Sequence, residues 1–303
     1  MQGKADEAKS KLLLGGLDEA QWKIGRKDGG MRLADRSIKL IGDNMFIGII
    51  YAIIIFFACV LGAVVGLGGG VFIRPIFDAI GYHNVLNIGF FSSSAILAMA
   101  VVSTIKKMRD GTKIDVKKAL LISLGALVGG MLGNLLLEHL LVTFAAEIYV
   151  QYVQIVATIV VLLFSLFLTT KTNLRYELGN KAYVAVLGVA LGATASFLGI
   201  GGGPINVPLL MIFFGFNIKD ATAYSIVIIF FSHLSRIVTL GVTVGYMYFD
   251  LSVLPYVVVA AAAGGLVGAG LSKIFSEATV KRLFQGAISA VILLNIANGL
   301  FLI

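Results

Sequence analysis

Gly66-Leu67-Gly68-Gly69-Gly70 and Gly199-Ile200-Gly201-Gly202-Gly203 are the two five-residue runs that decide the fold of this chain. Each run ends a long apolar segment, and a proline follows five residues after it, at Pro75 and Pro208. Glycine weakens a helix interior, and irregular backbone persists in a bilayer only where it lines a cavity or a site. Two breaks at matching positions predict broken helices around a solute site near the membrane centre.

The composition places the chain in a membrane. Of its 303 residues, 58% are hydrophobic and 13% are charged, against about 25% charged residues in soluble domains. Apolar runs of about 20 residues recur, the length that crosses a hydrocarbon core of about 30 Å. The net charge is +8, and the basic residues lie between the apolar segments. There they indicate membrane topology and do not indicate nucleic-acid binding. We predict an all-α polytopic protein of the lipid bilayer.

We predict about eight transmembrane helices in two repeats of four, each repeat with a glycine-rich break and a re-entrant half-helix. The spans are 45–65, 85–105, 118–141 and 149–170, then 182–198, 219–241, 251–271 and 280–301. The half-helices 71–80 and 204–214 measure about 15 Å at 1.5 Å per residue, too short to cross alone.

The chain divides into three parts in this interpretation. Residues 1–44 form a cytoplasmic or membrane-surface segment, either an amphipathic helix or a partly ordered tail. Residues 45–170 are the first four-helix repeat and residues 171–303 the second. An offset of 133 residues aligns the halves, and it pairs Gly70 with Gly203, Pro75 with Pro208, Asn84 with Asn217, and Ser92 with Ser225.

Glycines also recur within the third span. Gly125, Gly129 and Gly133 are four residues apart, so they form a smooth helix face on which another helix packs closely. With two further residues inserted, Gly129 and Gly133 align with Gly264 and Gly268 in the second half. This agreement supports an internal duplication.

Loop charge predicts the orientation. Loops 106–118 and 171–181 are basic, whereas 138–148 has no Lys or Arg, so the positive-inside rule places the basic loops, and with them both termini, in the cytoplasm. If each half crosses the membrane four times, the two halves have the same orientation and are parallel. If each half-helix also counts as a full crossing, the second half is inverted relative to the first. The parallel arrangement misplaces Lys273, Lys281 and Arg282, and the inverted one misplaces Arg32, Arg36 and Lys39. We favour the parallel arrangement because the half-helices are short.

The breaks predict an anionic solute. A half-helix that begins after each run points its free N–H groups and positive dipole end at the break; alternatively, the glycines only permit close packing. Arg74 lies four residues past the first run, and its guanidinium suits carboxylate, sulfonate, phosphate or sulfate oxygens. It could instead snorkel or pair with Asp78 at i+4. Its counterpart is Val207, with Asn206 the nearest polar residue, so the site is expected to be asymmetric.

The sixth span carries the second intramembrane cation. Ser225, Ser232 and Arg236 share one helix face with Thr222, and His233 lies three residues before Arg236. Arg236 could snorkel at the membrane edge, and His233 could bond a neighbouring helix. The predicted substrate-binding residues are Gly68, Gly69, Gly70, Arg74, Ser92, Gly201, Gly202, Gly203, Asn206, Ser225 and Arg236. Candidates for coupling to H⁺ or Na⁺ are Asp78, His83 and His233.

Enzyme chemistry has no support in the sequence. The single cysteine, Cys59, allows no internal disulfide and no cysteine metal site. We expect it to be a small buried residue that contributes to packing. There is no HExxH, no GxSG serine with a suitable histidine, and no GK[ST] after either run. We predict no catalytic residues, no metal and no cofactor.

The paired runs with their downstream prolines resemble the TauE/SafE sulfite exporter family (the toluene sulfonate uptake permease family) over about residues 45–303. The resemblance rests on the duplicated G-x-G-G-G-x(4)-P pattern, although Val71 stands where the second half has Pro204. It implies a secondary transporter of a sulfur-containing anion, sulfite or an organosulfonate such as sulfoacetate, in a bacterial inner (cell) membrane. We expect alternating access around a central site. An anion channel, or a transporter of another carboxylate or oxyanion, is the alternative, and a homo-oligomer is left open.

Overall fold

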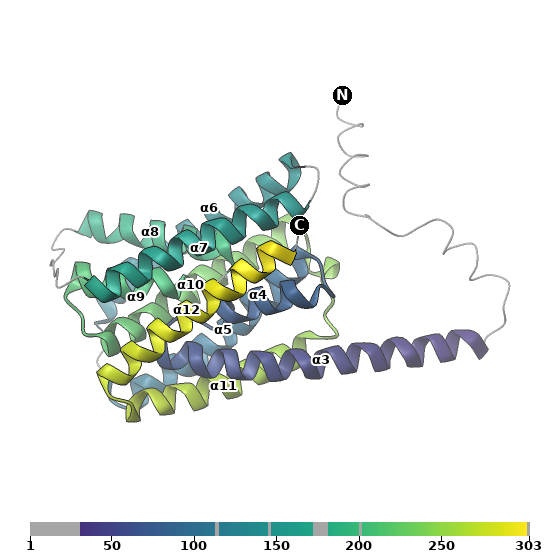
Figure 1. Cartoon of the computed structure of the whole chain (residues 1–303), viewed down its shortest axis with the longest axis horizontal. Helices are drawn as coiled ribbons and strands as arrows, with labels where there is room; N and C mark the ends of the chain where they lie inside the picture. Colours follow the sequence, from purple (N-terminus) through teal and green to yellow (C-terminus); the bar gives the residue numbers. More distant parts are fainter. Residues whose placement is uncertain (1–30, 113–114, 145–146, 172–180, 200–201, 302–303) are drawn as a thin grey trace. The chain divides into compact units, whose positions relative to one another are not determined.

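The computed structural model describes residues 31–112, 115–144, 147–171, 181–199 and 202–301 (Figure 1). These residues form ten α-helices, one 3-10 turn and no strand, which confirms the all-α prediction. Seven of the helices are long and apolar enough to cross a membrane, and the segments Ala182–Leu198 and Gly203–Phe214 are shorter apolar helices. The chain divides into two compact units, 1–46 and 47–303, and the second contains the candidate site.

The elements follow one another as α3 (Met31–Val65), α4 (Gly70–Ile80), α5 (Val85–Arg109), α6 (Val116–Thr143), α7 (Glu147–Lys171), α8 (Lys181–Leu198), α9 (Gly203–Phe214), α10 (Ile218–Thr243), the 3-10 turn Tyr246–Tyr248, α11 (Leu254–Ile274) and α12 (Glu277–Phe301). The first predicted span is therefore the second part of a longer helix. Residues 1–30 of the predicted N-terminal segment lie outside the described residues.

Helix α4 runs back along α3. The Tyr51 ring stacks on Phe77 with 3.7 Å between centroids, and the Tyr51 hydroxyl lies 2.9 Å from His83 Nδ1. The end of α4 is thus beside the early part of the α3 span. The reversal falls at the first glycine run, where Gly66 and Gly68 adopt φ of 72° and 71°, a region that strongly favours glycine.

Helix α9 runs back along α8 in the same way. In α7, Gln154 Nε2 donates to the Phe197 carbonyl at 2.8 Å, and Ser165 Oγ donates to the Pro204 carbonyl. The end of α8 therefore lies beside Gln154 of α7, and the beginning of α9 lies beside Ser165, farther along α7. The chain thus reverses its direction between α8 and α9. Pro208 has no N–H to donate to the carbonyl four residues earlier, which is that of Pro204, so the Ser165 hydroxyl supplies the missing donor.

The junctions that follow the two half-helices share one local geometry. Gly81 and Gly215 end α4 and α9 with φ of 66° and 65°. Asn84 and Asn217 then begin α5 and α10, and each side-chain oxygen accepts the backbone N–H three residues on at 2.8 Å. Asparagine is a strong N-cap because this bond satisfies a free donor of the first turn.

The predicted glycine face of α6 packs on α8, as expected. A Cβ on Gly125 would overlap the Ala185 carbonyl, and a Cβ on Gly133 would overlap the Ala193 carbonyl. Because both residue numbers rise together, α6 and α8 run in the same direction. Small residues allow the two backbones to approach this closely.

The same contact recurs between α11 and α3. A Cβ on Gly264 would lie 2.5 Å from the Phe56 carbonyl, and one on Gly268 would overlap the Val60 carbonyl. These helices also run in the same direction. Helix α6 therefore packs on α8, and α11 packs on α3, through the same kind of glycine contact.

One end of the 47–303 unit, which we call the basic end, gathers lysines and arginines. Lys273 Nζ lies 3.4 Å from Asp110 Oδ1, and Lys219 Nζ donates to the Lys273 carbonyl at 3.4 Å. These bonds join the α5–α6, α9–α10 and α11–α12 junctions. The described basic residues of this end are Lys106, Lys107, Arg109, Lys117, Lys118, Lys219, Lys273, Lys281 and Arg282.

The opposite end, the acidic end, carries a polar cluster. Asn84 Nδ2 donates to the Tyr248 hydroxyl at 3.1 Å, and His83 Nε2 lies 3.8 Å from Asp250 Oδ2. Thr243 Oγ1 donates to Glu138 at 2.8 Å. The described parts of loops 81–84, 144–147 and 244–253 carry no lysine or arginine.

Acidification is expected to destabilise the protein through His83 at this end. Burial lowers the pKa of His83, and the nearby Asp250 carboxylate opposes that shift. As pH falls below the ordinary pKa of about 6.5, the unfolded chain takes up a proton that the folded chain resists, so stability falls until the lower folded pKa is reached. The melting temperature of purified protein should drop between about pH 7 and pH 5, and drop less in His83→Gln. Identical pH profiles for the two proteins would contradict this role.

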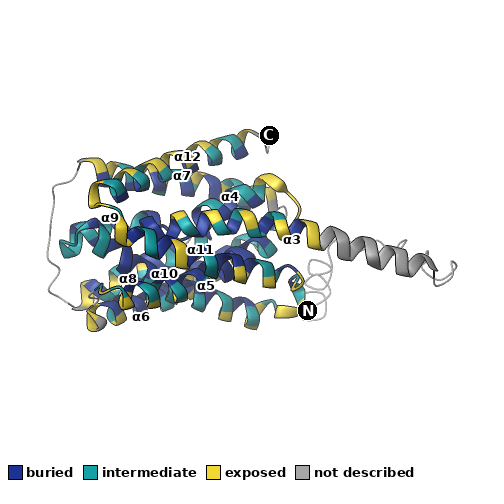
Figure 2. Ribbon diagram, turned by 90° about the horizontal axis from the view of Figure 1, so that it is seen from below, coloured by how far each residue is buried: buried dark blue, intermediate teal, exposed yellow. Residues whose placement is uncertain are grey.

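Burial is concentrated on two helices. Figure 2 shows buried residues gathered on α5 and α10, whereas α7 and α12 carry many exposed and intermediate positions. The exposed positions include large apolar side chains, as expected of helices that face lipid. Helices α5 and α10 therefore form the interior against which both hairpins pack.

Candidate functional site

The two glycine runs touch each other. A Cβ on Gly203 would overlap the backbone of Leu67, so α9 begins directly against the first run. Ser225 Oγ donates to the Gly66 carbonyl at 2.7 Å, and Ser92 Oγ donates to the Gly199 carbonyl at 3.3 Å. A serine of α10 thus binds the first break, and a serine of α5 binds the second. This crossing brings the N-terminal ends of α4 and α9 into one region.

Two guanidinium groups lie side by side at the second break. A Cβ on Gly199 would overlap Arg74 Nη1 and would lie 2.8 Å from Arg236 Nη1. Arg74 comes from α4 and Arg236 from α10, and they are 4% and 1% exposed. Gly199 has φ of 65° and no side chain, so it admits both groups where an alanine would not.

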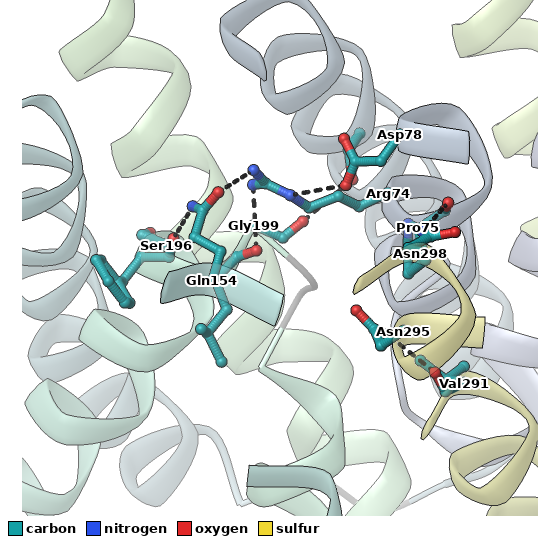
Figure 3. Close-up of polar contacts among 12 residues, drawn as sticks. Arg74, Pro75, Asp78, Gln154, Ser196, Gly199, Val291, Asn295 and Asn298 are labelled. Atoms are coloured by element: carbon teal, nitrogen blue, oxygen red, sulfur yellow. Dashed lines mark hydrogen bonds and ion pairs between the residues drawn. The ribbon is translucent and has the colours of Figure 1, made fainter. Parts of the chain in front are cut away.

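Arg74 is held on three sides (Figure 3). Its Nη1 donates to the Leu198 carbonyl at 3.2 Å, its Nη2 donates to Gln154 Oε1, and its Nε lies 3.7 Å from Asp78 Oδ2. The ion pair with Asp78 and the position at the break therefore coexist. Because Gln154 also donates to the chain at Phe197, α7 fixes Arg74 and the end of α8 together.

Arg236 has a sparser environment. Its Nη1 donates to the Ser196 carbonyl at 2.8 Å, its Nη2 lies against Gly89, and its Nε has no hydrogen-bond partner. No carboxylate of the described residues lies within 4 Å of this guanidinium. A buried charge without a counterion is costly, so the guanidinium of Arg236 has capacity for an anionic partner.

Further unpartnered polar groups lie on the same elements. Both side-chain atoms of Asn206 in α9, both ring nitrogens of His233 in α10 and Ser93 Oγ in α5 are buried without a hydrogen-bond partner. The position of a Cβ on Gly202 is 3.4 Å from Asn206 Oδ1, so this amide lies at the second break. Buried polar groups are almost always bonded, so each of these unbonded groups has capacity for a hydrogen bond to water or to a solute.

A small cavity adjoins Arg74 between α4, α7 and α12. Its volume of about 10 Å³ is room for about one water molecule. The cavity is lined mainly by polar side chains, namely Arg74, Asp78, Gln151, Gln154, Thr158 and Asn295, with Pro75 and Ile155. Solute access to Arg74 therefore requires these helices to separate.

Most of the predicted site residues come together, and some do not. Gly68, Gly69 and Gly70 form the first turn of the chain back into α4, while Gly202 and Gly203 form the second. Gly201 lies outside the described residues. Asp78 is beside Arg74, whereas His83 belongs to the polar cluster of the acidic end and is not in the site.

Sequence reasoning missed Gln154 and Ser196. Gln154 supplies the amide that binds Arg74, and Ser196 supplies a carbonyl to Arg236. The signal for Gln154 was available: Gln151, Gln154 and Thr158 lie three and four residues apart, which places three polar groups on one face of an apolar span. No signal could indicate Ser196, because its backbone makes the contact.

Comparison with known proteins gives one match. The family model described as "Sulfite exporter TauE/SafE" matches residues 51–294, which include both glycine runs, the half-helices α4 and α9, and both arginines. No curated protein and no solved structure matches the chain.

Proposed function

Because the chain belongs to the sulfite exporter TauE/SafE family, we propose that it is a secondary transporter that moves sulfite or an organosulfonate such as sulfoacetate across the membrane. The observation that carries this proposal is the pair of guanidinium groups at Gly199, which faces a single ion-pairing carboxylate, that of Asp78, among the described residues. The unbalanced positive charge is suited to an anion. The family is one of membrane anion transporters, not of enzymes.

The chemistry of the site favours a small oxyanion. Guanidinium groups present planar forks of N–H donors that match sulfonate, sulfite or carboxylate oxygens. Neither α4 nor α9 has a side-chain cap at its N-terminus, so we propose that the first N–H groups of each helix, at Gly70 and Gly203, bind the solute. We propose Gly68–Gly70, Gly202 and Gly203 as backbone ligands, with Asn206 as an amide ligand and Ser92 and Ser225 as supports of the breaks.

We further propose that the two halves are an inverted duplication. Hairpin α3–α4 returns to the acidic end and hairpin α8–α9 returns to the basic end, so the re-entrant half-helices come from opposite sides. This differs from the parallel arrangement that the sequence favours. The positive-inside rule then puts the basic end in the cytoplasm. We therefore propose that Ile47 and the end of α12 lie on the non-cytoplasmic side, in place of the cytoplasmic termini that the sequence favours.

The mechanism that fits this geometry is alternating access. The Asn84–Tyr248 and His83–Asp250 contacts join the loops of the acidic end, and the cavity at Arg74 has room for about one water molecule. Rocking of the hairpins against α5 and α10 would open the site to one side at a time. We propose Asp78 as the coupling group for H⁺, because its Oδ1 is buried without a partner while its Oδ2 faces Arg74.

Transport by purified protein in proteoliposomes tests the function. Radiolabelled sulfoacetate should accumulate faster when the opposite side contains unlabelled sulfoacetate, because a carrier exchanges one solute for another. A thermal-shift screen with sulfite, sulfoacetate, taurine, sulfate and small carboxylates would rank the substrates. Flux without any acceleration by solute on the opposite side would favour the channel alternative, and stabilisation by carboxylates alone would redirect the substrate class.

A further inference from the structure

The basic end contains a polar pocket that the proposed central site does not use. Its volume is about 310 Å³, and its lining includes Lys107, Asp110, Lys219, Asp220, Ser272 and Lys273. Its walls come from the end of α5, the beginning of α10 and the end of α11. Fifteen residues of α5 separate Lys107 from Ser92 of the central region, about 22 Å at 1.5 Å per residue. The pocket therefore lies far from Ser92 and the second break, on the side of the first break.

Lys107 is a buried cation in the wall of this pocket. Its side chain is 6% exposed, and its Nζ lies 3.4 Å from Thr222 Oγ1 and 3.3 Å from Ser272 Oγ. Both partners are neutral hydroxyls at long distances, and an ammonium has three donors. No carboxylate of the described residues lies within 4 Å of Nζ. The lysine thus has capacity for an anionic partner.

The acidic groups that face the pocket do not supply that partner. Asp110 is bound by Lys106 at 2.9 Å and by Lys273 at 3.4 Å. Asp220 accepts a hydrogen bond from Asn217 Nδ2 at 2.8 Å, and Glu277 is exposed at the start of α12. Lys219 also lines the pocket, so Lys107 has another cation nearby and no free carboxylate in contact.

Lys107 is also connected to the first glycine run. Its partner Thr222 packs on Gly66, where a Cβ would lie 2.6 Å from the Thr222 Cα. Thr222 and Ser225 are three residues apart on α10, and Ser225 donates to the Gly66 carbonyl. An anion bound at Lys107 would therefore be separated from the first glycine run by one residue, Thr222.

We infer that Lys107 forms a second anion-binding site, an entrance vestibule at the basic end in which sulfonate-type solute binds before or after it occupies the central site. This inference rests on the proposed function for the identity of the solute. The ammonium supplies the charge, and the Thr222 and Ser272 hydroxyls supply further hydrogen bonds. Its equivalent in the other half is Leu240, so the vestibule belongs to one end alone.

Thiol protection tests the vestibule without any transport. In a Thr112→Cys protein, the new thiol lies in the pocket wall and the native Cys59 is buried. Sulfoacetate, which does not react with maleimides, should slow labelling by a charged maleimide in a saturable manner. Lys107→Met should raise the half-protecting concentration about tenfold or more, as expected when a charged hydrogen bond is lost.

Matched variants make the result specific. Lys117→Gln removes the same charge from an exposed position at the same end and should change the half-protecting concentration less than about twofold. Lys107→Arg should retain protection, and Lys107→Gln replaces the methionine variant if the latter does not purify. Arg236→Gln should abolish transport and leave vestibule protection intact.

Each outcome decides one of the two proposals. The vestibule is overturned if the Lys107→Met protein has the same half-protecting sulfoacetate concentration as the parent, or if sulfoacetate does not protect the parent at all. In either case, transport by the parent would still support the proposed function. If the parent is protected in a Lys107-dependent manner but does not transport, the vestibule stands and the proposed function falls.

Discussion

Arg236→Gln is expected to reduce sulfoacetate transport about 100-fold or more while the protein still folds. The guanidinium lies next to that of Arg74 at Gly199, has an unpartnered Nε and has no carboxylate within 4 Å among the described residues. We propose that the solute balances its charge in the loaded state. Loss of a charged hydrogen bond to the solute lowers affinity by this order. Proteoliposome uptake at fixed substrate concentration measures the effect.

Two controls separate charge from structure. Arg236→Lys keeps the charge but loses the planar fork, so it should retain partial transport with weaker binding. Arg282→Gln removes an exposed arginine at the basic end and should transport like the parent. Unchanged uptake by Arg236→Gln, at equal protein incorporation, would remove Arg236 from the binding site.

Gly203→Ala is expected to destabilise the protein by about 3 kcal/mol or more. The added methyl group would overlap three backbone atoms of Leu67, where the two glycine runs cross. Backbone cannot move aside as a flexible side chain can, and overpacking of this kind is costly. The variant should show a large fall in melting temperature, or a loss of monodisperse protein in size-exclusion chromatography.

Gly270→Ala provides the matched control. Gly270 also lies in a helix, α11, and nothing is within 4 Å of the added methyl position. Alanine there should be neutral or stabilise the helix by up to about 1 kcal/mol. If both substitutions gave the same small effect, the two runs would not be in contact, and the crossing of the breaks would have to be abandoned.

The sequence allowed the paired breaks to be predicted because glycine and proline act locally. The offset of 133 residues also paired Ser92 with Ser225, and these two serines make equivalent bonds to Gly199 and Gly66. Their roles were not predictable, since the identity of a partner in another helix is a tertiary fact. The sequence predicts that both serines bind solute, which stays a prediction, and in the structure their hydroxyls donate to the carbonyls of the breaks.

The direction of the hairpins was also beyond the sequence. The length of a half-helix shows that it cannot cross alone, but not whether it continues or turns back. The Tyr51–Phe77 stacking answers this for α4, and it depends on residues 26 positions apart. The burial of Lys107 was not predictable for a related reason. In the sequence it lies at the end of a span, like an ordinary loop lysine, and it is buried only through its tertiary contacts.

The exchange of glycine helices between the halves has a consequence for biogenesis. When the ribosome has completed α7, α3 still lacks α11, its partner through Gly264 and Gly268, and α6 still lacks α8. Neither half can reach its final packing while it is alone in the bilayer, and long-range contacts form late and slowly. The first half must wait in the membrane as an incomplete assembly, so truncated chains should be substrates for quality-control proteases, and separately synthesised halves should be rescued only by each other.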